Sequence, residues 1–543
     1  MSDGPRRNQG QRSGGGFSGG GRPTGGRPER GRPGGPDRSG GRAGGTRTPQ
    51  DRQARSGSGG GDRDKKAWGT YRKADPDPAR RAAFDLLVSV AARDAYANLA
   101  ISPLLVERRI VGRDAALVTE LTYGTLRHRG TLDAILAAGS SRPVEKVDLR
   151  VLQALRLGAY QLLYTRIPAH AAVAATVEVA RVALTDGPAR FVNAVLRRVS
   201  ERDLEAWLPE ITPDLATDPI GHLAVAHSHP EWIVRVFADA LGEDAAALAS
   251  GGSETARALA ADNERPTVDL AARPGRMEPA ELAEIVGGEP GNWSPVGVRL
   301  PEGAPGSFPP IADGRAHVQD EGSQLCAWTL ANAPLDGEDT RWLDLCAGPG
   351  GKAGLLGAIA GQRGARVTAV EIAEHRAELV SSAVAGFPVE VLVADGRDVG
   401  KRPELPESGF DRVLVDAPCT GLGALRRRPE ARWRRQPGDV PALTKLQREL
   451  VLAALRAVRP GGLVAYVTCS PHLAETRVMI ADVCRRTGAE PIDVRVVPAA
   501  AAAADVNPKD PADASPARAA SLQLWPHRHG TDGMFLSLLR RPA

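Results

Sequence analysis

The chain has few cysteines, the residues that stabilise disulfide-rich proteins and many metal-binding proteins. Its 543 residues include only five cysteines, an odd number that is spread over the second half of the chain. This usage argues against a disulfide framework and for a reducing compartment. No two cysteines form a Cys-x-x-Cys pair, so we expect no structural zinc and no other metal centre.

Long hydrophobic runs are also missing. No stretch of about 18 apolar residues could span a bilayer, and the N-terminus lacks the apolar core of a signal peptide. We therefore expect a cytoplasmic protein without a membrane segment. Aromatic residues make up only 4% of the chain, but 42% of it is hydrophobic, which suffices for globular cores in about two to four domains.

Aliphatic residues are almost absent from the N-terminal tail, residues 1–70. Residues 1–66 carry 13 Arg and 2 Lys against 6 acidic residues, whereas the whole chain has a net charge of only +5. The basic excess therefore lies in the tail. A Gly/Arg/Pro/Ser-rich segment buries too little surface to offset chain entropy, so we expect disorder. It could serve to solubilise the chain or as an RNA tether.

Residues 71–205 have the periodicity of helices. Asp77 followed by Pro78 is typical of a helix start, and apolar residues recur at helical spacing in five segments. No strand pattern interrupts them, which predicts an all-α bundle. The next segment, residues 206–315, predicts a small α+β domain. We expect its His227 and His229 to be cap or surface residues rather than metal ligands.

Strand and helix patterns alternate in residues 316–543. This alternation predicts a Rossmann-like α/β domain with a doubly wound parallel sheet. The candidate strands are residues 342–345, 366–371, 389–393, 410–415, 463–468, 492–497 and 534–539.

A glycine-rich loop follows the first of these strands. Gly348, Gly350 and Ala353 fit the pattern G-x-G-x-x-A, and Glu371 ends the next strand 23 residues after Gly348. Such glycines let the backbone approach a ligand, and the acid can accept hydrogen bonds from ribose hydroxyls. The loop is not a phosphate-binding Walker loop. It fits nicotinamide and flavin cofactors as well as S-adenosylmethionine.

Two cysteines lie at the ends of apolar runs that predict buried strands. Cys419 stands in the motif Asp-Ala-Pro-Cys that begins at Asp416, and Cys469 stands in Thr-Cys-Ser. Ligands gather at the carboxyl ends of the strands in open α/β sheets, so two thiols there indicate covalent chemistry. For the other three cysteines we expect inert, buried thiols.

These motifs together resemble the RsmB/Sun family of RNA 5-methylcytosine methyltransferases. The resemblance is carried by residues 318–324, 346–352, 416–423, 426–430 and 468–470, together with Glu475 and Thr476. Residues 79–87, 119–127 and 187–197 resemble the RNA-binding antitermination factor NusB. The resemblance extends over residues 76–543, and the domain order is that of the family.

The resemblance implies S-adenosyl-L-methionine as cofactor and small-subunit (16S) ribosomal RNA as substrate. It implies that Cys469 is the nucleophile, that Cys419 assists breakdown of the covalent adduct, that Asp416 hydrogen-bonds cytosine and that Lys352 orients the site. DNA cytosine methyltransferases would use the Pro-Cys thiol instead, so these two roles rest on the resemblance. We expect the protein to be a monomer. The expected cofactor-binding residues are Cys346, Ala347, Gly348, Pro349, Gly350, Gly351, Lys352, Glu371, Asp395 and Asp416.

A basic segment follows Cys419 closely. Arginines with an aromatic residue among them suit phosphate contact and base stacking, although a solvated basic loop would have the same composition. We expect RNA contacts from Arg426, Arg427, Arg428, Arg432 and Arg434. Three alternatives to the expected function remain open: a non-catalytic RNA-binding assembly factor, a methyltransferase for another RNA, and a DNA methyltransferase.

Overall fold

The computed structural model describes residues 76–543 except residue 302 and residues 507–519. The expected disorder of residues 1–70 concerns a segment outside these residues. Within the described ranges, none of the helices combines the length and the apolar composition needed to cross a bilayer.

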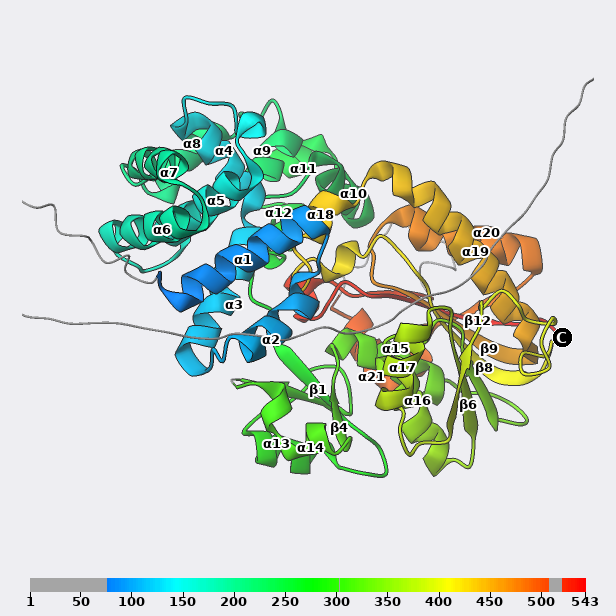
Figure 1. The fold of residues 1–543 in the computed structure, drawn as a ribbon. Coiled ribbons are helices and arrows are strands. Elements are labelled where there is room, and N and C mark those ends of the chain that lie inside the picture. The colour runs from blue at the N-terminus through cyan, green and yellow to red at the C-terminus, as the bar shows by residue number, and fades with distance from the viewer. Residues whose placement is uncertain (1–75, 302, 507–519) are drawn as a thin grey trace, which may run out of the picture. The chain divides into compact units, whose positions relative to one another are not determined.

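The first part of the described chain is all helix, as predicted (Figure 1). The Asp77 side chain caps the first helix by accepting a hydrogen bond from the backbone N–H of Arg80 at 2.8 Å. The fifth helix forms the centre of the core, because its residues 151–161 are all buried. The helices are α1 (Pro78–Arg93), α2 (Ala97–Glu107), α3 (Gly112–Arg127), α4 (Arg129–Gly139), α5 (Leu149–Tyr164), α6 (Ala169–Ala183) and α7 (Asp186–Val199).

Two of these helices, α2 and α4, were not predicted. α2 is apolar on most sides and contains Pro103, so it shows no one-sided pattern. α4 follows α3 with His128 alone between them, and in the sequence it continues the preceding helix.

A small antiparallel sheet follows, which confirms the predicted α+β character. Its strand order is β2-β3-β1-β4. The strands are β1 (Val268–Ala272), β2 (Glu289–Pro290), β3 (Gly297–Leu300) and β4 (Ala316–Val318). The accompanying helices are α8 (Leu204–Ile211), α9 (Pro219–Ala226), α10 (Glu231–Leu241), α11 (Ala245–Ala249), α12 (Glu254–Ala261), α13 (Pro279–Val286) and α14 (Pro309–Ala312).

One expectation for this region is wrong. His229 is not a surface residue: it is buried, and its Nε2 lies 3.6 Å from Oδ2 of the equally buried Asp262. His227 caps the end of α9, as expected.

The large sheet has the order β10-β12-β9-β8-β5-β6-β7, and β11 pairs with β12. Neighbouring strands from β7 to β9 run parallel, as predicted, but β12 and β10 are antiparallel, so the sheet is mixed. The strands are β5 (Arg341–Asp344), β6 (Arg366–Glu371), β7 (Val389–Val393), β8 (Phe410–Asp416), β9 (Val458–Thr468), β10 (Glu490–Ile492), β11 (Leu522–Gln523) and β12 (Phe535–Arg540).

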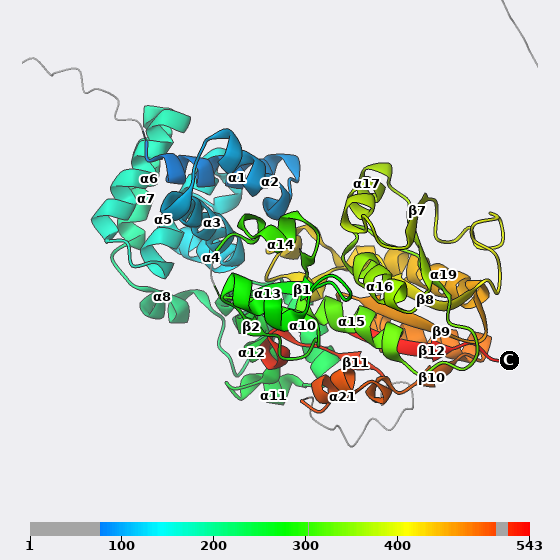
Figure 2. The ribbon, with the colours of Figure 1, turned by 90° about the horizontal axis from the view of Figure 1, so that it is seen from below.

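Helices cover both faces of this sheet, which is the doubly wound arrangement (Figure 2). Leu414 of β8 shares a core with α15 and α16, whereas Val413 and Val415 share a different core with α19 and α20. The alternation along one strand thus divides the two helical layers. The helices are α15 (Glu321–Asn332), α16 (Gly351–Gln362), α17 (Glu374–Ala383), α18 (Ala431–Arg434), α19 (Val440–Ala457), α20 (Arg477–Thr487), α21 (Pro498–Ala504) and α23 (Pro526–His529).

The predicted strand at residues 492–497 is wrong for most of its length. β10 ends at Ile492, and a short 3-10 turn, Val494–Val496, follows. The Asp493 side chain accepts a hydrogen bond from the backbone N–H of Arg495 at 2.9 Å. This local bond favours a turn over a continued strand.

Candidate active site

The two cysteines singled out from the sequence lie side by side. β8 and β9 are adjacent parallel strands, with Asp416 opposite Val467. The loops that follow them bring Cys419 Sγ to 3.4 Å from Cys469 Sγ. This separation allows one thiol to donate a hydrogen bond to the other sulfur.

The two thiols differ in acidity. The hydrogen bond from Cys419 lowers the pKa of Cys469 despite burial and the charge of Asp416, and the charges of Arg428 and Lys352 lower it further. The pKa of Cys419 is raised, first by its hydrogen bond to Cys469 and then by burial. The thiolate, which is the nucleophilic form, therefore forms first at Cys469.

The remaining cysteines have no such activation. Burial raises the pKa of Cys326 to about 12, and burial also raises the pKa values of Cys346 and Cys484. The structure thus separates one acidic thiol from four that stay protonated at neutral pH.

Lys352 and Asp416 form an ion pair beside the thiols. Lys352 Nζ donates a hydrogen bond to Asp416 Oδ2 at 2.9 Å, and the lysine side chain is only 9% exposed. Burial lowers the pKa of Lys352, but the charge of Asp416, its hydrogen bond to Lys352 and the nearby Cys326 and Cys469 together raise it above its usual value. The two residues come from α16 and the end of β8, so the pair links the glycine loop to the cysteine loop.

The backbone of the glycine loop is hydrogen-bonded to the side chains of Glu371 and Arg376. Gly348 N donates to Glu371 Oε2 at 3.1 Å, and Arg376 Nη2 donates to the carbonyl oxygen of Gly348 at 2.8 Å. A Cβ added to Gly348 would lie 2.3 Å from Glu371 Oε2, and Gly350 has a φ of +110°. The positive φ of Gly350 therefore favours glycine, and a side chain at position 348 would have to displace the Glu371 carboxylate.

Sequence reasoning missed Asp344, the last residue of β5. It is 1% exposed, its Oδ1 accepts a hydrogen bond from Cys346 N at 3.2 Å, and its Oδ2 has no hydrogen-bond partner in the structure. Burial, and next the charge of Asp416, raise the pKa of Asp344 to about 7. Its position directly before the glycine loop is the sequence feature from which it could have been predicted as a site residue.

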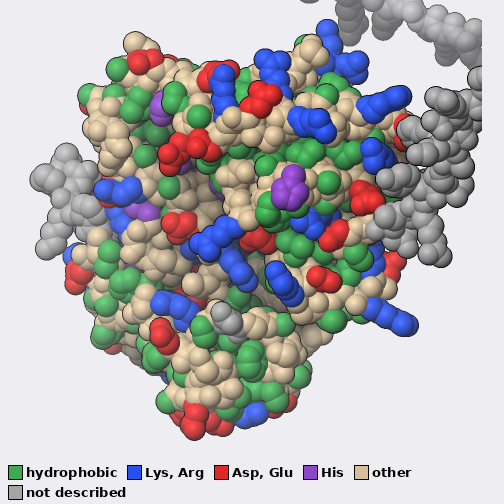
Figure 3. All heavy atoms as spheres, turned by 90° about the vertical axis from the view of Figure 1, so that its left-hand side faces the viewer, with side chains coloured by type: hydrophobic (Ala, Val, Ile, Leu, Met, Phe, Trp, Pro, Cys, Tyr) green, Lys and Arg blue, Asp and Glu red, His purple; other side chains and the backbone are tan. Residues whose placement is uncertain are grey.

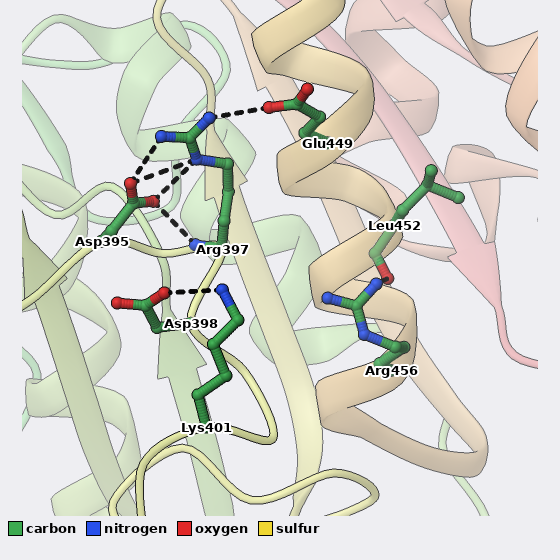
Figure 4. Close-up of a pocket in the computed structure, with 7 residues that line it drawn as sticks. All are labelled: Asp395, Arg397, Asp398, Lys401, Glu449, Leu452 and Arg456. Atoms are coloured by element: carbon green, nitrogen blue, oxygen red, sulfur yellow. Dashed lines mark hydrogen bonds and ion pairs between the residues drawn. The ribbon is translucent and has the colours of Figure 1, made fainter.

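Asp395 lies at the rim of a pocket of about 440 Å³ (Figure 4). The Arg397 guanidinium joins Asp395 Oδ2 at 2.6 Å to Glu449 Oε2 at 2.7 Å. The hydrogen bonds from Arg397 hold the pKa of Asp395 below its usual value. A ligand group that reaches Asp395 would therefore share the carboxylate with Arg397.

Two of the five arginines predicted to contact RNA are buried. Arg426 is 4% exposed, and Arg432 is fully buried. Arg426 Nη2 donates to the carbonyl oxygen of Gly530 at 2.9 Å, and Arg432 Nη2 donates to that of Asp262 at 2.7 Å. The prediction is wrong for these two residues, because a buried guanidinium bonded to protein carbonyls offers no surface to a polynucleotide.

The other three arginines differ in their hydrogen-bond partners and in their exposure. Arg427 pairs with Asp320 at 2.9 Å and with Asp532 at 3.0 Å. Arg434 donates to the carbonyl oxygen of Ala95 at 2.6 Å. Of the three, only Arg428 is exposed. On the face drawn in Figure 3, basic side chains lie among acidic and apolar ones rather than in a patch of one sign. Direct RNA contact stays a prediction for Arg427, Arg428 and Arg434, and Arg428 is the exposed one of the three.

Two family models match separate parts of the chain. The family model of the 16S rRNA methyltransferase RsmB/F matches residues 330–540, and that of the NusB family matches residues 77–201. The crystal structure of PH0851 matches 86% of this chain and 99% of that chain, with a TM-score of 0.67 and 19% identity. This likeness shows a common fold.

Two curated relatives match along almost their whole length. A putative methyltransferase of Mycobacterium tuberculosis (strain ATCC 25618 / H37Rv) is 54% identical over 470 residues, which are 87% of this chain and 98% of the relative. The probable ribosomal RNA small subunit methyltransferase B of Bacillus subtilis (strain 168) is 31% identical, over 85% of this chain and 98% of the relative.

Proposed function

Because this chain belongs to the 16S rRNA methyltransferase RsmB/F family, we propose that it methylates carbon 5 of a cytosine in small-subunit ribosomal RNA. S-adenosyl-L-methionine is the proposed methyl donor. The observation that carries the proposal is the 3.4 Å separation between Cys419 Sγ and Cys469 Sγ. Neither a non-catalytic RNA-binding protein nor a methyltransferase acting on nitrogen or oxygen needs two thiols so close together.

The residues of the glycine loop fit the proposed cofactor. A side chain at Gly348 would collide with the Glu371 carboxylate, so the glycine allows Glu371 Oε2 to lie 3.1 Å from its backbone nitrogen. In this proposal Glu371 takes the ribose hydroxyls, and Asp395 and Asp416 contact other polar parts of the molecule, while residues 346–352 line it. When bound, S-adenosyl-L-methionine supplies an electrophilic methyl group.

Cys469 begins the proposed reaction. Carbon 5 of cytosine is a poor nucleophile, but addition of the Cys469 thiolate to carbon 6 breaks the 5,6 double bond and makes carbon 5 enamine-like. The hydrogen bond from Cys419 is the largest cause that lowers the pKa of Cys469 and so favours this thiolate, and the positive charges of Arg428 and Lys352 lower it further. Asp416, held by Lys352, hydrogen-bonds the polar edge of the base.

Cys419 completes the reaction in this proposal. After methylation, carbon 5 carries a proton that must leave before the bond between carbon 6 and Cys469 Sγ can break. Once Cys469 Sγ is bonded to carbon 6, the hydrogen bond that most raises the pKa of Cys419 is lost, so the Cys419 thiol can release its proton to solvent. Its thiolate then takes the carbon-5 proton, and the electron pair left on carbon 5 restores the double bond and expels Cys469 as a thiolate. The target base has to leave its stack to reach the thiols.

The region of α1–α7 supports ribosomal RNA as the substrate class. It matches the NusB family, and this chain has it ahead of the matched catalytic region. The B. subtilis relative is named for the small ribosomal subunit. We assign RNA docking to this region.

Two variants test the chemistry. Purified wild-type protein, Cys469→Ala and Cys419→Ala are incubated with radiolabelled S-adenosyl-L-methionine and small-subunit ribosomal RNA. We expect Cys469→Ala to lose methyl transfer and Cys419→Ala to accumulate a protein–RNA adduct that survives denaturation. Retained turnover in Cys469→Ala would refute the nucleophile assignment.

Bisulfite sequencing of ribosomal RNA from a deletion strain tests the substrate. One cytosine of the small-subunit RNA should lose its protection. An unchanged map, together with methylation of another RNA or of DNA in a competition assay, would overturn the assignment to ribosomal RNA.

A further inference from the structure

A single buried carboxylate connects the two cysteine loops. We infer that Glu475 is a positioning residue that fixes the two cysteine loops relative to each other and keeps the shared proton on Cys419. The inference rests on the proposed function, because it gives the pair one nucleophile and one proton carrier. Glu475 lies in a 3-10 turn, Leu473–Glu475, and is fully buried.

The carboxylate binds the residue that follows each cysteine. Glu475 Oε1 accepts a hydrogen bond from Thr420 N at 2.9 Å, and Oε2 accepts one from Thr420 Oγ1 at 2.5 Å. Glu475 Oε2 also accepts from Ser470 Oγ at 2.6 Å. Thr420 directly follows Cys419 and Ser470 directly follows Cys469, so one side chain fixes the separation of the two loops.

Neighbouring residues hold the carboxylate in turn. Gln447 Nε2 donates to Glu475 Oε1 at 3.0 Å and to the carbonyl oxygen of Pro418 at 2.9 Å. Tyr466 OH donates to the backbone carbonyl oxygen of Glu475 at 2.7 Å. The residues on both sides of Cys419 are therefore hydrogen-bonded to Glu475 or to Gln447, which itself binds Glu475. These bonds restrict the position of the Cys419 sulfur.

The charge of Glu475 acts on one thiol of the pair. It is among the causes that raise the pKa of Cys419, after the hydrogen bond to Cys469 and burial. The causes that lower the pKa of Cys469 include the positive charges of Arg428 and Lys352. The charge of Asp416 opposes them and raises the pKa of Cys469. The negative charge of Glu475 near Cys419, with the hydrogen bond between the thiols and the two positive charges near Cys469, favours the proton on Cys419 against this opposing charge.

The variant Glu475→Gln separates this role from simple packing. It keeps the shape of the side chain but removes the charge, and it replaces one acceptor oxygen by an NH₂ group that cannot accept from Thr420 or Ser470. The selectivity of the pair should then fall, because Cys419 ionises more readily. A residue that only packs would leave this selectivity unchanged.

The test measures which thiol reacts. Wild-type protein, Glu475→Gln and the exposed control Glu378→Gln are treated with less than one equivalent of iodoacetamide, and labelling of each cysteine is measured by mass spectrometry. Labelling of Cys484, outside the pair, serves as the internal reference. We expect the ratio of Cys469 to Cys419 labelling to fall about tenfold in Glu475→Gln, as one unit of differential pKa implies, and to stay unchanged in Glu378→Gln.

Turnover supplies the second readout. Methyl transfer by Glu475→Gln should fall by at least about tenfold in kcat with little change in KM for RNA, and Glu475→Asp should restore part of it. If Glu475→Gln does not fold, as judged by its melting curve, Ser470→Ala is used instead, since it removes one donor and leaves the carboxylate. Wild-type labelling ratios in the folded variant would overturn the inference.

The labelling result does not depend on the substrate. A changed ratio in a protein that methylates no cytosine would support the positioning role and refute the proposed function. An unchanged ratio in a protein that does methylate cytosine would refute the positioning role alone.

Discussion

Arg432 Nη1 donates a hydrogen bond to Asn263 Oδ1 at 2.7 Å and another to the carbonyl oxygen of Arg127 at 2.9 Å. Arg127 ends α3, Asn263 follows α12, and Arg432 lies 13 residues after Cys419. The segment that leaves the catalytic loop is therefore anchored in the helical region. Arg434 reaches the carbonyl oxygens of Val90 and Ala95 from the same segment.

Loss of this anchor should destabilise the protein. Arg432→Met leaves several buried carbonyl groups and Asn263 Oδ1 without their donor, so we expect the free energy of unfolding to fall by about 3–5 kcal/mol, as for a broken buried charge network. Urea unfolding followed by circular dichroism measures the change.

The matched control is Arg428→Met, which changes an exposed arginine four residues away. Its effect should stay within about 0.5 kcal/mol. Equal stability of the two variants would show that the contacts of Arg432 contribute nothing to the fold.

Cofactor binding should depend on the missing side chain at position 348. A Cβ there would lie 2.3 Å from Glu371 Oε2 and 2.7 Å from Arg376 Nη2. Gly348→Ala must displace the acid proposed to hold the ribose, so we expect the Kd for S-adenosyl-L-methionine to rise by about tenfold or more, which is about 1.4 kcal/mol. Isothermal titration calorimetry measures it.

Gly187→Ala serves as the control, since a Cβ at that position meets no atom within 4 Å. It should bind the cofactor like the wild-type protein. Unchanged affinity in Gly348→Ala would mean that the loop does not form the site.

The elements of the fold that could be predicted are those with a local pattern. β6 and β7 have the predicted bounds, 366–371 and 389–393, because their apolar residues are bounded by turn-forming segments. The antiparallel direction of β12 could not be predicted. The residues of a strand predict that it is a strand, but they do not determine the direction in which it enters the sheet. The same limit applies to the sheet as a whole, which is mixed rather than parallel.

The residues of the candidate site also differ in how far the sequence could predict their positions. The placement of Cys419 and Cys469 at one edge of the sheet could be predicted because each follows a buried strand, whereas the pairing of the two strands is a finding of the structure. The burial of Arg432 could not, since a basic run has the same composition whether it faces solvent or protein carbonyls. Glu475 is among the residues that carry the family resemblance, but its positioning role could not be predicted, because its hydrogen-bond donors come from three separate segments.

Asp344 should make stability depend on pH. Its pKa is about 7 in the folded protein against an ordinary value of 3.8, so the unfolded chain gives up this proton at lower pH. Its contribution to stability is present below about pH 4 and is lost as the pH rises to about 7. Asp344→Asn should therefore be more stable than the wild type above about pH 7, by an amount on the order of a few kcal/mol.

Melting temperatures of both proteins between about pH 4 and pH 8 measure this effect. The difference should grow across that window and level off above it. Asp411, a buried acid at the opposite end of the sheet whose Oδ2 accepts from Thr340 N at 2.8 Å, provides the contrast: Asp411→Asn should be less stable than the wild type. A constant difference for Asp344→Asn across the window would contradict the raised pKa.

Arg428 should contribute both to RNA binding and to the acidity of the nucleophile. It is exposed beside the cysteine loops, and its charge lowers the pKa of Cys469. Arg428→Ala should weaken RNA binding and reduce the slope of log K against log salt by about one, as expected for one lost phosphate contact. The pH at which Cys469 reacts half-maximally with iodoacetamide should also rise. Arg366→Ala, at the start of β6 and therefore at the amino end of the sheet, should leave both quantities unchanged. A changed salt slope with an unchanged alkylation profile would show that Arg428 binds RNA without acting on the thiol. The reverse result would show that Arg428 acts on the thiol without binding RNA.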